Sequence, residues 1–373
     1  MGGEFFCPYP TWIVAAFFFI IIDNDYYSNK KGDPFIMLHA RNRIHWFIML
    51  IVLTVVLSGC GSSAVSPNSS PQAGTNGGDT AQQPNAAQEA ATTTYKDGLG
   101  REVEIPTHPQ RIVVLQYLPE MLAVGVKPVG AATHLLKNFV SIKDQVGGIE
   151  DTGAANDPNL EKILELQPDL IIGADWHEEQ LDKLSKIAPT VIVKWAGNDA
   201  FQHFKDTADV LGMSEQAEEW VQNYNKKAEE ARAKLSSFVK EGETFGTVVI
   251  GGFDKGQLRV YGNGNVGYVL FESLKFPMTD AVKQAWNKDE HELGMNISME
   301  KLPEFASADR LFVVKFDNDP DFLEKVGNSR LWSNLPAVKN HKVYTLDSNL
   351  WFSYDVMSFS AQIDDAVKLL SQP

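Results

Sequence analysis

Short apolar runs alternate with amphipathic segments from Arg111 to the end of the chain. The runs are rich in Val, Ile and Leu, which is typical of strands buried on both faces of a sheet. The segments between them repeat apolar residues at three- and four-residue steps, which predicts helices. The runs lie at 111–115, 128–133, 168–174 and 189–195, and again at 245–253, 256–262, 309–316 and 342–347. This alternation predicts an α/β fold with mostly parallel sheets that helices cover on both faces.

A long amphipathic helix is predicted between the two groups of strands. Residues 214–240 include no Gly or Pro, and Ser214 is suited to cap the start of a helix. Apolar or small residues recur there at helical spacing: Ala217, Trp220, Val221, Tyr224, Ala228, Ala231, Leu235 and Phe238. We therefore expect an N-terminal lobe over 95–213, an inter-lobe helix over 214–240 and a C-terminal lobe over 241–373. The first lobe opens with "DGLGREVEIP", which predicts a hairpin with Gly98 and Gly100 in its turn.

An export signal is predicted ahead of the lobes. Arg41 and Arg43 precede the apolar run Trp46–Leu57, which is short for a membrane span and suits the core of a signal peptide. The run ends in Leu57-Ser58-Gly59-Cys60, which resembles the bacterial lipobox. This resemblance implies a signal peptide over 37–59, cleavage before Cys60 and a lipid on its thiol. The alternative is an ordinary buried cysteine after an apolar helix.

The segments on either side of the signal differ in character. Residues 60–94 are almost wholly Gly, Ser, Ala, Pro, Asn, Gln and Thr, which predicts a flexible tether. Before Met37 lies a second apolar run, Trp12–Ile22, and we expect translation to start at Met37, with 1–36 an extension outside the protein. The alternative is a membrane hairpin. Cys7 and Cys60 are the two cysteines, so the lobes have neither disulfides nor thiolate chemistry.

The net charge is −15 at pH 7. Acidic and basic side chains balance up to Gly59, so the acidic excess belongs to the part after it. An acidic body without basic runs argues against a nucleic-acid partner. The region from Tyr95 to Pro373 is long enough for two separate cores.

Four segments carry a resemblance to a known family: "HPQRIVVLQYLPEMLAVGVKPVG", "NLEKILELQPDLIIGA", "ISMEKLPEFASADRLFVV" and "LPAVKNHKVYTLDSNLW". Their order and spacing resemble bacterial substrate-binding proteins of iron-siderophore and cobalamin ABC importers. The resemblance covers nearly all of 95–373. It implies two Rossmann-like lobes joined by one rigid helix, a ligand cleft between them, little hinge motion and no catalysis.

The resemblance also implies how such a protein docks on its membrane permease. Family members place one glutamate on the exposed tip of each lobe, where it meets permease arginines. The corresponding residues here are Glu161 in "PNLEKI" and Glu300 in "SMEKL". Two fixed carboxylates far apart read position and orientation through charge-assisted hydrogen bonds. Each could also be simply a glutamate favoured by the positive end of a helix dipole.

Ligands of open α/β sheets lie beyond the carboxyl ends of the strands. Reading those ends gives these candidate ligand-binding residues: Tyr117, His134, Trp176, Trp195, Arg259, Tyr261, Trp286, Trp351 and Tyr354. A ferric siderophore already supplies six oxygen ligands to its iron, so the protein binds the outside of the complex. A guanidinium suits the oxygens of such a chelate, and aromatic faces suit its apolar spacers. With one strong basic candidate, we favour hydroxamate or citrate chelates over strongly anionic catecholates.

The histidines do not predict a metal site, since no H-x-H or H-E-x-x-H motif occurs and the lobes lack cysteine. No direct metal ligand and no cofactor are therefore expected, apart from the transported ferric siderophore. No nucleophile elbow or P-loop is present either.

One motif points elsewhere. Gly262, Gly264 and Gly267 form a G-x-G-x-x-G after a strand-like run, as in dinucleotide-binding proteins. Asp280 lies near the distance of the ribose-binding acid, but no strand precedes it. We expect these glycines to form a turn that lets the backbone approach a bulky ligand.

The sequence therefore predicts a binding protein of the cell membrane that is not an enzyme. It would be anchored outside the cytoplasm by a lipid on Cys60 and would deliver a ferric siderophore to an ABC permease. Cobalamin and haem are alternative ligands within the same family. The remote alternative is a surface-tethered oxidoreductase that uses a dinucleotide at the glycine motif.

Overall fold

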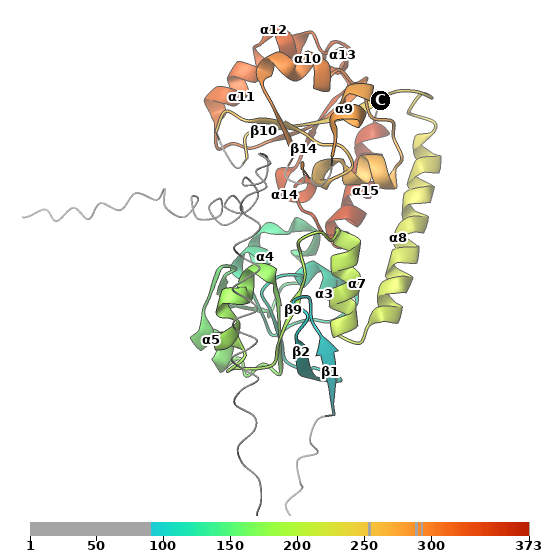
Figure 1. Cartoon of the computed structure of the whole chain (residues 1–373). Helices are drawn as coiled ribbons and strands as arrows, with labels where there is room; N and C mark the ends of the chain where they lie inside the picture. The colour runs from blue at the N-terminus through green and yellow to red at the C-terminus, as the bar shows by residue number, and fades with distance from the viewer. Residues whose placement is uncertain (1–90, 253–254, 288–289, 292–293, 373) are drawn as a thin grey trace, which may run out of the picture. The chain divides into compact units, whose positions relative to one another are not determined.

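A computed structural model describes residues 91–252, 255–287, 290–291 and 294–372 (Figure 1). The chain divides into two units, Met1–Pro84 and Asn85–Pro373, and the described residues belong to the second. The predicted extension, signal peptide and Cys60 lie outside them. Among the described residues, no helix has the length and apolar character that a bilayer crossing requires.

The described part opens with the predicted hairpin. Strand β1 (Thr92–Lys96) pairs antiparallel with β2 (Glu102–Pro106), and the turn between them contains both expected glycines. The Gly98 amide donates to the Ile192 carbonyl at 2.7 Å, which joins this turn to the edge of the first sheet. A side chain at Gly98 would lie 2.7 Å from the Lys194 backbone, so glycine is required there. Because β1 begins at Thr92, the predicted tether over 60–94 extends three residues too far.

The first lobe (the N-lobe, residues 91–213) contains a five-stranded sheet in the order β5-β4-β3-β8-β9. All its pairings are parallel, as predicted. Counted along the chain, the order is third, second, first, fourth, fifth, which is a Rossmann-type arrangement. The strands are β3 (Ile112–Val114), β4 (Gly130–Ala131), β5 (Glu150–Asp151), β8 (Leu170–Ala174) and β9 (Thr190–Val193), with a small hairpin of β6 (Gly153–Ala154) and β7 (Asp157–Pro158) after β5.

The second lobe (the C-lobe, residues 236–372) repeats this order as β12-β11-β10-β13-β14. Its central pairings are parallel, but β11 pairs antiparallel with both β10 and β12, which differs from a mostly parallel sheet. The cause is local: Gly251 and Gly252 have positive φ and turn the chain straight back after β10, leaving no room for a crossover helix. The strands are β10 (Phe245–Ile250), β11 (Leu258–Val260), β12 (Met295–Ile297), β13 (Arg310–Lys315) and β14 (Val343–Leu346).

Helices cover both faces of each sheet, as the apolar runs predict. Along β3, Val113 packs into one core cluster of the N-lobe and Val114 into the other. Along β10, Val248 and Val249 divide in the same way between the two C-lobe clusters. The N-lobe helices are α3 (Leu118–Ala123), α4 (Thr133–Asn138), α5 (Leu160–Glu165), α6 (Leu181–Leu184) and α7 (Ala200–Val210). Those of the C-lobe are α9 (Asp280–Ala285), α10 (Leu302–Phe305), α11 (Pro320–Gly327), α12 (Arg330–Ser333), α13 (Pro336–Lys339), α14 (Ser348–Trp351) and α15 (Val356–Leu370).

The predicted inter-lobe helix is α8 (Ser214–Leu235), which has 22 residues (Figure 1). Its buried residues Ala217, Tyr224, Ala228, Ala231 and Leu235 belong to the predicted apolar face. The helix ends five residues earlier than the predicted boundary at 240, so Phe238 falls in the following turn and is 43% exposed. Ser214 is not the N-cap: it is the first helical residue, and its hydroxyl donates to Asp209.

A second helix also joins the lobes. The N-terminus of α15 packs into the N-lobe, where Val356 is buried with Phe204, Ala208 and Ala217. The hydroxyls of Ser358 and Ser141 are 2.8 Å apart across the same contact. Farther along, Phe359, Ile363, Ala366 and Leu370 complete the C-lobe core. The predicted division at 241–373 assigned α15 to the C-lobe alone, because its periodicity does not reveal which lobe each turn contacts.

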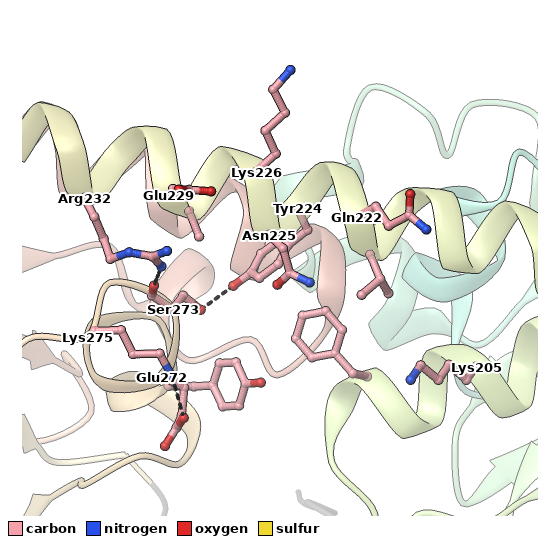
Figure 2. Close-up of a pocket in the computed structure, with 14 residues that line it drawn as sticks. Lys205, Gln222, Tyr224, Asn225, Lys226, Glu229, Arg232, Glu272, Ser273 and Lys275 are labelled. Atoms are coloured by element: carbon pink, nitrogen blue, oxygen red, sulfur yellow. Dashed lines mark hydrogen bonds and ion pairs between the residues drawn. The ribbon is translucent and has the colours of Figure 1, made fainter.

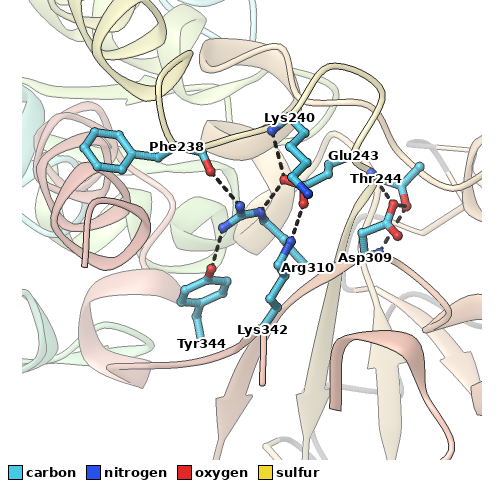
Figure 3. Close-up of polar contacts among 8 residues, drawn as sticks. All are labelled: Phe238, Lys240, Glu243, Thr244, Asp309, Arg310, Lys342 and Tyr344. Carbon is cyan, nitrogen blue, oxygen red and sulfur yellow. Dashed lines mark hydrogen bonds and ion pairs between the residues drawn. The ribbon is translucent and has the colours of Figure 1, made fainter. Parts of the chain in front are cut away.

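A polar network holds the start of the C-lobe sheet to the end of α8 (Figure 3). Glu243 forms ion pairs with Arg310, at 2.8 Å, and with Lys342. Arg310 also donates to the Phe238 carbonyl and to the Tyr344 hydroxyl, at 2.7 and 2.6 Å. Burial alone would raise the pKa of the Glu243 carboxyl. The hydrogen bonds from Lys342, Arg310 and the Lys240 amide outweigh it and lower the pKa to about 2.

Replacing Glu243 by Gln should lower the free energy of unfolding by about 2 kcal/mol at pH 7, because the amide loses the charge-assisted bonds. Since the pKa is lowered in the folded state, this contribution exists above the ordinary value of 4.5 and disappears toward pH 2. In urea unfolding, the free energy of unfolding of Glu243→Gln should therefore differ strongly from that of the wild type at pH 7 and only slightly at pH 3. Glu241→Gln, at an exposed neighbour, is the control. Equal losses at both pH values would contradict this account.

Candidate functional site

Two tryptophans lie together at the carboxyl ends of the N-lobe strands. Trp176 follows β8 and Trp195 follows β9, and their rings meet edge to face with centroids 5.5 Å apart. Trp176 is 38% exposed, and Trp195 is half-buried. They present an aromatic surface where an open α/β sheet receives ligands.

Polar contacts orient Trp195. The Asp175 carboxylate accepts hydrogen bonds from the backbone amides of Trp195 and Ala196, at 3.2 and 3.1 Å. The His203 ring stacks on the indole at 4.4 Å, and its Nε2 donates to the Trp195 carbonyl at 3.0 Å. Burial lowers the pKa of His203, so the imidazole is neutral and carries the donated proton on Nε2. Trp195 is thus positioned through both its backbone and its ring.

Tyr354 of the C-lobe reaches this surface. Its ring lies 6.4 Å from that of Trp195 and meets Phe359 edge-on at 5.3 Å. The Tyr268 ring is also perpendicular to that of Tyr354, at 6.4 Å. Residues that follow strands of both lobes are therefore neighbours, as a site shared by the lobes requires.

Arg259 belongs to a second part of the candidate site, at the strand ends of the C-lobe. It is 4% exposed on β11, so it does not lie on a solvent face. Its Nε donates to the Asn296 amide oxygen at 3.1 Å, and a second guanidinium nitrogen donates to Gln257. A side chain at Gly252 would lie 3.3 Å from both the guanidinium and the Phe316 ring, so these two groups lie side by side. Guanidinium next to an aromatic ring suits an oxygen-rich ligand with apolar parts.

Phe316 and Phe352 extend this second part. Their rings meet at 5.1 Å in an edge-to-face contact, and both side chains are half-buried. Phe316 directly follows β13, where strand-end reasoning points, whereas sequence reasoning missed Phe352. Phe352 is two residues from Tyr354, so one short loop contributes to both parts of the site.

Three of the predicted ligand-binding residues are buried instead. Tyr117 is 1% exposed and donates its hydroxyl to the Val193 carbonyl at 3.0 Å. Tyr261 is fully buried, and its ring fills the space beside Gly294. Trp351 is also fully buried and donates Nε1–H to Asp365 at 2.7 Å. These predictions are wrong for direct contact, because a position after a strand can point into the core as readily as toward a ligand.

His134 lies on α4, the helix that follows β4. It is half-buried, and its Nε2 is 3.2 Å from the Gln116 side-chain oxygen. Its ring meets that of Phe139 at 6.4 Å. Burial, and then the charge of His177, lower its pKa. A neutral imidazole at this strand end can donate or accept one hydrogen bond.

The glycine motif serves an internal packing purpose. A side chain at Gly262 would lie 2.5 Å from the Trp286 indole, and one at Gly264 would lie 3.1 Å from it. A side chain at Gly267 would overlap the Gly262 carbonyl, at 1.9 Å. The bulky group that the glycines accommodate is therefore the indole of Trp286, and not a bound ligand as expected. Trp286 is held there by its Nε1–H bond to Asn263, at 2.7 Å.

The two glutamates that the resemblance assigns to docking occupy matching positions in the two lobes. Glu161 lies in the first turn of α5, which Asn159 caps, and Glu300 lies in the 3₁₀ turn Met299–Lys301. Each turn leads into the fourth strand of its sheet, β8 or β13. Both side chains are exposed. Hydrogen bonds from its own backbone amide and from the Ser298 hydroxyl lower the pKa of Glu300, which keeps it ionised.

A buried carboxyl pair behind the aromatic surface escaped sequence reasoning. Glu120 on α3 and Asp355, the N-cap of α15, are each 2% exposed. Burial and the charge of Asp355 raise the pKa of Glu120 well above its usual value. Burial raises the pKa of Asp355 to about 6, although it accepts a hydrogen bond from Ser358. The two residues are far apart in sequence, and no local motif joins them.

Within the described ranges, no three His, Cys, Asp or Glu side chains are grouped as a metal site.

Comparison with known proteins gives a consistent set of relatives. The periplasmic binding protein family matches residues 114–350. The chain is 32% identical to the iron(3+)-hydroxamate-binding protein YxeB of Bacillus subtilis, over 86% of this chain and 94% of that protein. It is 30% identical to the iron(3+)-hydroxamate-binding protein FhuD of the same organism, over 90% and 100%. A solved FhuD-fold binding protein of a B. subtilis ferrichrome ABC transporter is similar with TM-score 0.66 and 31% identity, over 75% of this chain and 100% of that one.

Replacing Glu120 by Gln should make the protein more stable at pH 7.5, by about 1 kcal/mol, since it removes one of two buried carboxyls. Because the pKa of both carboxyls is raised in the folded state, the pair contributes its full stability below the ordinary pKa values of 4.5 for Glu120 and 3.8 for Asp355. That stability is lost as the pH rises through about 6. Urea unfolding at pH 4 and 7.5 should show the gain at the higher pH alone. Glu165→Gln, at an exposed position, is the control, and parallel pH profiles for Glu120→Gln and wild type would contradict the coupling.

Proposed function

The chain belongs to the periplasmic binding protein family, and we propose that it captures a ferric hydroxamate siderophore outside the cytoplasm and delivers it to an ABC importer. One observation carries the proposal. A buried guanidinium beside Phe316 and the pair of Trp176 and Trp195 line the strand ends of a chain that is 32% identical to an iron(3+)-hydroxamate-binding protein.

The chemistry of the ligand fits these groups. A hydroxamate siderophore supplies all six oxygen ligands of its iron, so recognition depends on the outer face of the complex. Arg259 can donate to the hydroxamate oxygens, and Trp176, Trp195 and Phe316 can contact the apolar spacers. A complex with little net charge also suits a protein of net charge −15, which would repel a strongly anionic chelate.

Delivery depends on parts of the chain remote from these rings. Glu161 and Glu300, one on each lobe, would meet arginines of the permease. A lipid on Cys60 would keep the protein at the membrane. The protein acts through binding alone and transfers the chelate without chemical change.

Titration of the Asn85–Pro373 unit with ferrichrome should quench tryptophan fluorescence, since Trp176 is exposed at the site. Arg259→Gln should weaken ferrichrome binding about ten-fold, because one charge-assisted bond to the chelate is lost. Arg330→Gln, which removes an exposed arginine of α12, is the matched control and should leave the affinity unchanged.

The same titration decides among ligands. Ferric citrate, haem and cobalamin should bind more weakly than ferrichrome. Tighter binding of haem or cobalamin would overturn the choice of ligand, and nicotinamide or flavin absorbance in the purified protein would favour an oxidoreductase instead. A response to none of the iron chelates would reject the proposed function.

The double variant Glu161→Ala with Glu300→Ala should abolish uptake of ferrichrome by cells that rely on this protein, while ferrichrome affinity stays intact. The carboxylates are exposed and lie in the first turn of α5 and in the turn before α10, not in the strand-end segments that hold the rings, so their loss should affect docking alone. Glu165→Ala with Glu304→Ala removes two exposed carboxylates from the neighbouring helical turns. This control should support normal uptake. A loss of affinity in the first variant would contradict a docking role.

A further inference from the structure

A pocket lies alongside α8, with a volume of about 720 Å³ (Figure 2). Its walls come from α7, from α8 and from the segment between Tyr268 and Lys275, so they belong to both lobes and to the helix that joins them. None of the residues predicted to bind the siderophore lines it. It is therefore distinct from the strand-end site.

Aromatic rings form one wall of this pocket. The Phe201 ring lies 5.1 Å from that of Tyr224 and 6.0 Å from that of Tyr268. The Tyr224 hydroxyl is 2.6 Å from the Ser273 hydroxyl, which keeps the ring in place. Burial raises the pKa of Tyr224 to about 12, so the phenol is neutral. A neutral wall of three rings suits a flat, apolar ring of a ligand.

Cationic groups face the same space from more than one element. Lys205 on α7 makes no hydrogen bond or ion pair among the described residues, and in Figure 2 its ammonium points toward the space below α8. Arg232 on α8 donates one N–H to the Ser273 carbonyl, at 2.6 Å. Asn225 adds an amide that also points into this space (Figure 2). Such donors are suited to a carboxylate or sulfonate.

The two carboxylates of the lining differ in their partners. Glu272 is neutralised by Lys275 Nζ at 3.3 Å and accepts from Asn263 Nδ2 at 2.7 Å. Glu229 lines the pocket and forms no ion pair among the described residues, so it opposes an anion. Lys226 points away from the pocket in Figure 2, and Lys275 is paired with Glu272. Lys205 and Arg232 therefore face the pocket against Glu229 alone, in a chain whose net charge is −15.

We propose that this pocket binds a small organic anion that carries a flat ring. The ring would lie on Phe201, Tyr224 and Tyr268, and the acidic group would receive hydrogen bonds from Lys205, Arg232 and Asn225. The occupant would touch both lobes at once. The pocket lies next to the strand-end residues, since the Tyr268 and Tyr354 ring centroids are 6.4 Å apart. This site does not depend on the identity of the transported ligand.

The test uses 8-anilinonaphthalene-1-sulfonate as a fluorescent ring-bearing anion, bound to the Asn85–Pro373 unit. 1-Naphthoate should displace the dye, and the uncharged 1-naphthalenemethanol should be at least about five-fold weaker, because it lacks the charge that the cations recognise. Equal displacement by the acid and the alcohol would overturn the proposal.

Three variants locate the dye. Lys205→Gln should weaken dye binding about five-fold, and Glu229→Gln should strengthen it about two-fold, since the first removes a cation and the second an opposing carboxylate. Lys226→Gln is the matched control for charge, because its ammonium points away from Asn225 and Lys205 in Figure 2, and it should change little. Equal effects of Lys205→Gln and Lys226→Gln would overturn the proposal. Dye that ferrichrome displaces and Lys205→Gln leaves unchanged would lie in the strand-end site and would overturn it too.

Discussion

The contact on which the rest of the structure depends is the packing of the start of α15 into the N-lobe. Val356 is buried there among Phe204, Ala208 and Ala217, while the rest of α15 completes the core of the C-lobe. Burying one such side chain contributes about 2 kcal/mol, and separating the lobes would expose the whole cluster. With α8 as a second connection, lobe opening is costly. The packing of α15 and α8 therefore favours lobes that keep their arrangement over a wide hinge motion.

Burial also determines the charge of the strand-end site. It lowers the pKa of His134 and His203 and raises that of Tyr117, so all three favour neutral forms at neutral pH. Arg259 supplies positive charge from a buried strand, held by Asn296 and Gln257. Neutral rings and one oriented guanidinium at these strand ends are the features on which the proposed ligand of low net charge rests. The glutamate network at the opposite, amino-terminal ends of the C-lobe strands serves the fold instead.

Much of the architecture could be predicted because it follows from residue patterns within short stretches of the chain. Apolar runs and helical spacing predicted the main strands, the two lobes, the hairpin and the long helix. Positions after strands gave Trp176, Trp195 and Tyr354, whose rings lie next to one another. Their role in ligand binding, and that of Arg259, stays a prediction. The same rule misplaced Tyr117, Tyr261 and Trp351, which point into the core. A position after a strand indicates the edge of the sheet but not the direction of the side chain.

The sequence by itself determined the order of strands and helices and the residue types near each strand end, because both follow from neighbours within a few positions. The tertiary structure alone decided which distant residues meet. It brought the Trp286 indole onto Gly262 and Gly264, where the motif suggested a ligand, and it paired Glu120 with Asp355. It also inserted α15 into the first lobe. These contacts join residues tens to hundreds of positions apart, and their energies depend on shape and burial, which no local pattern of residue types contains.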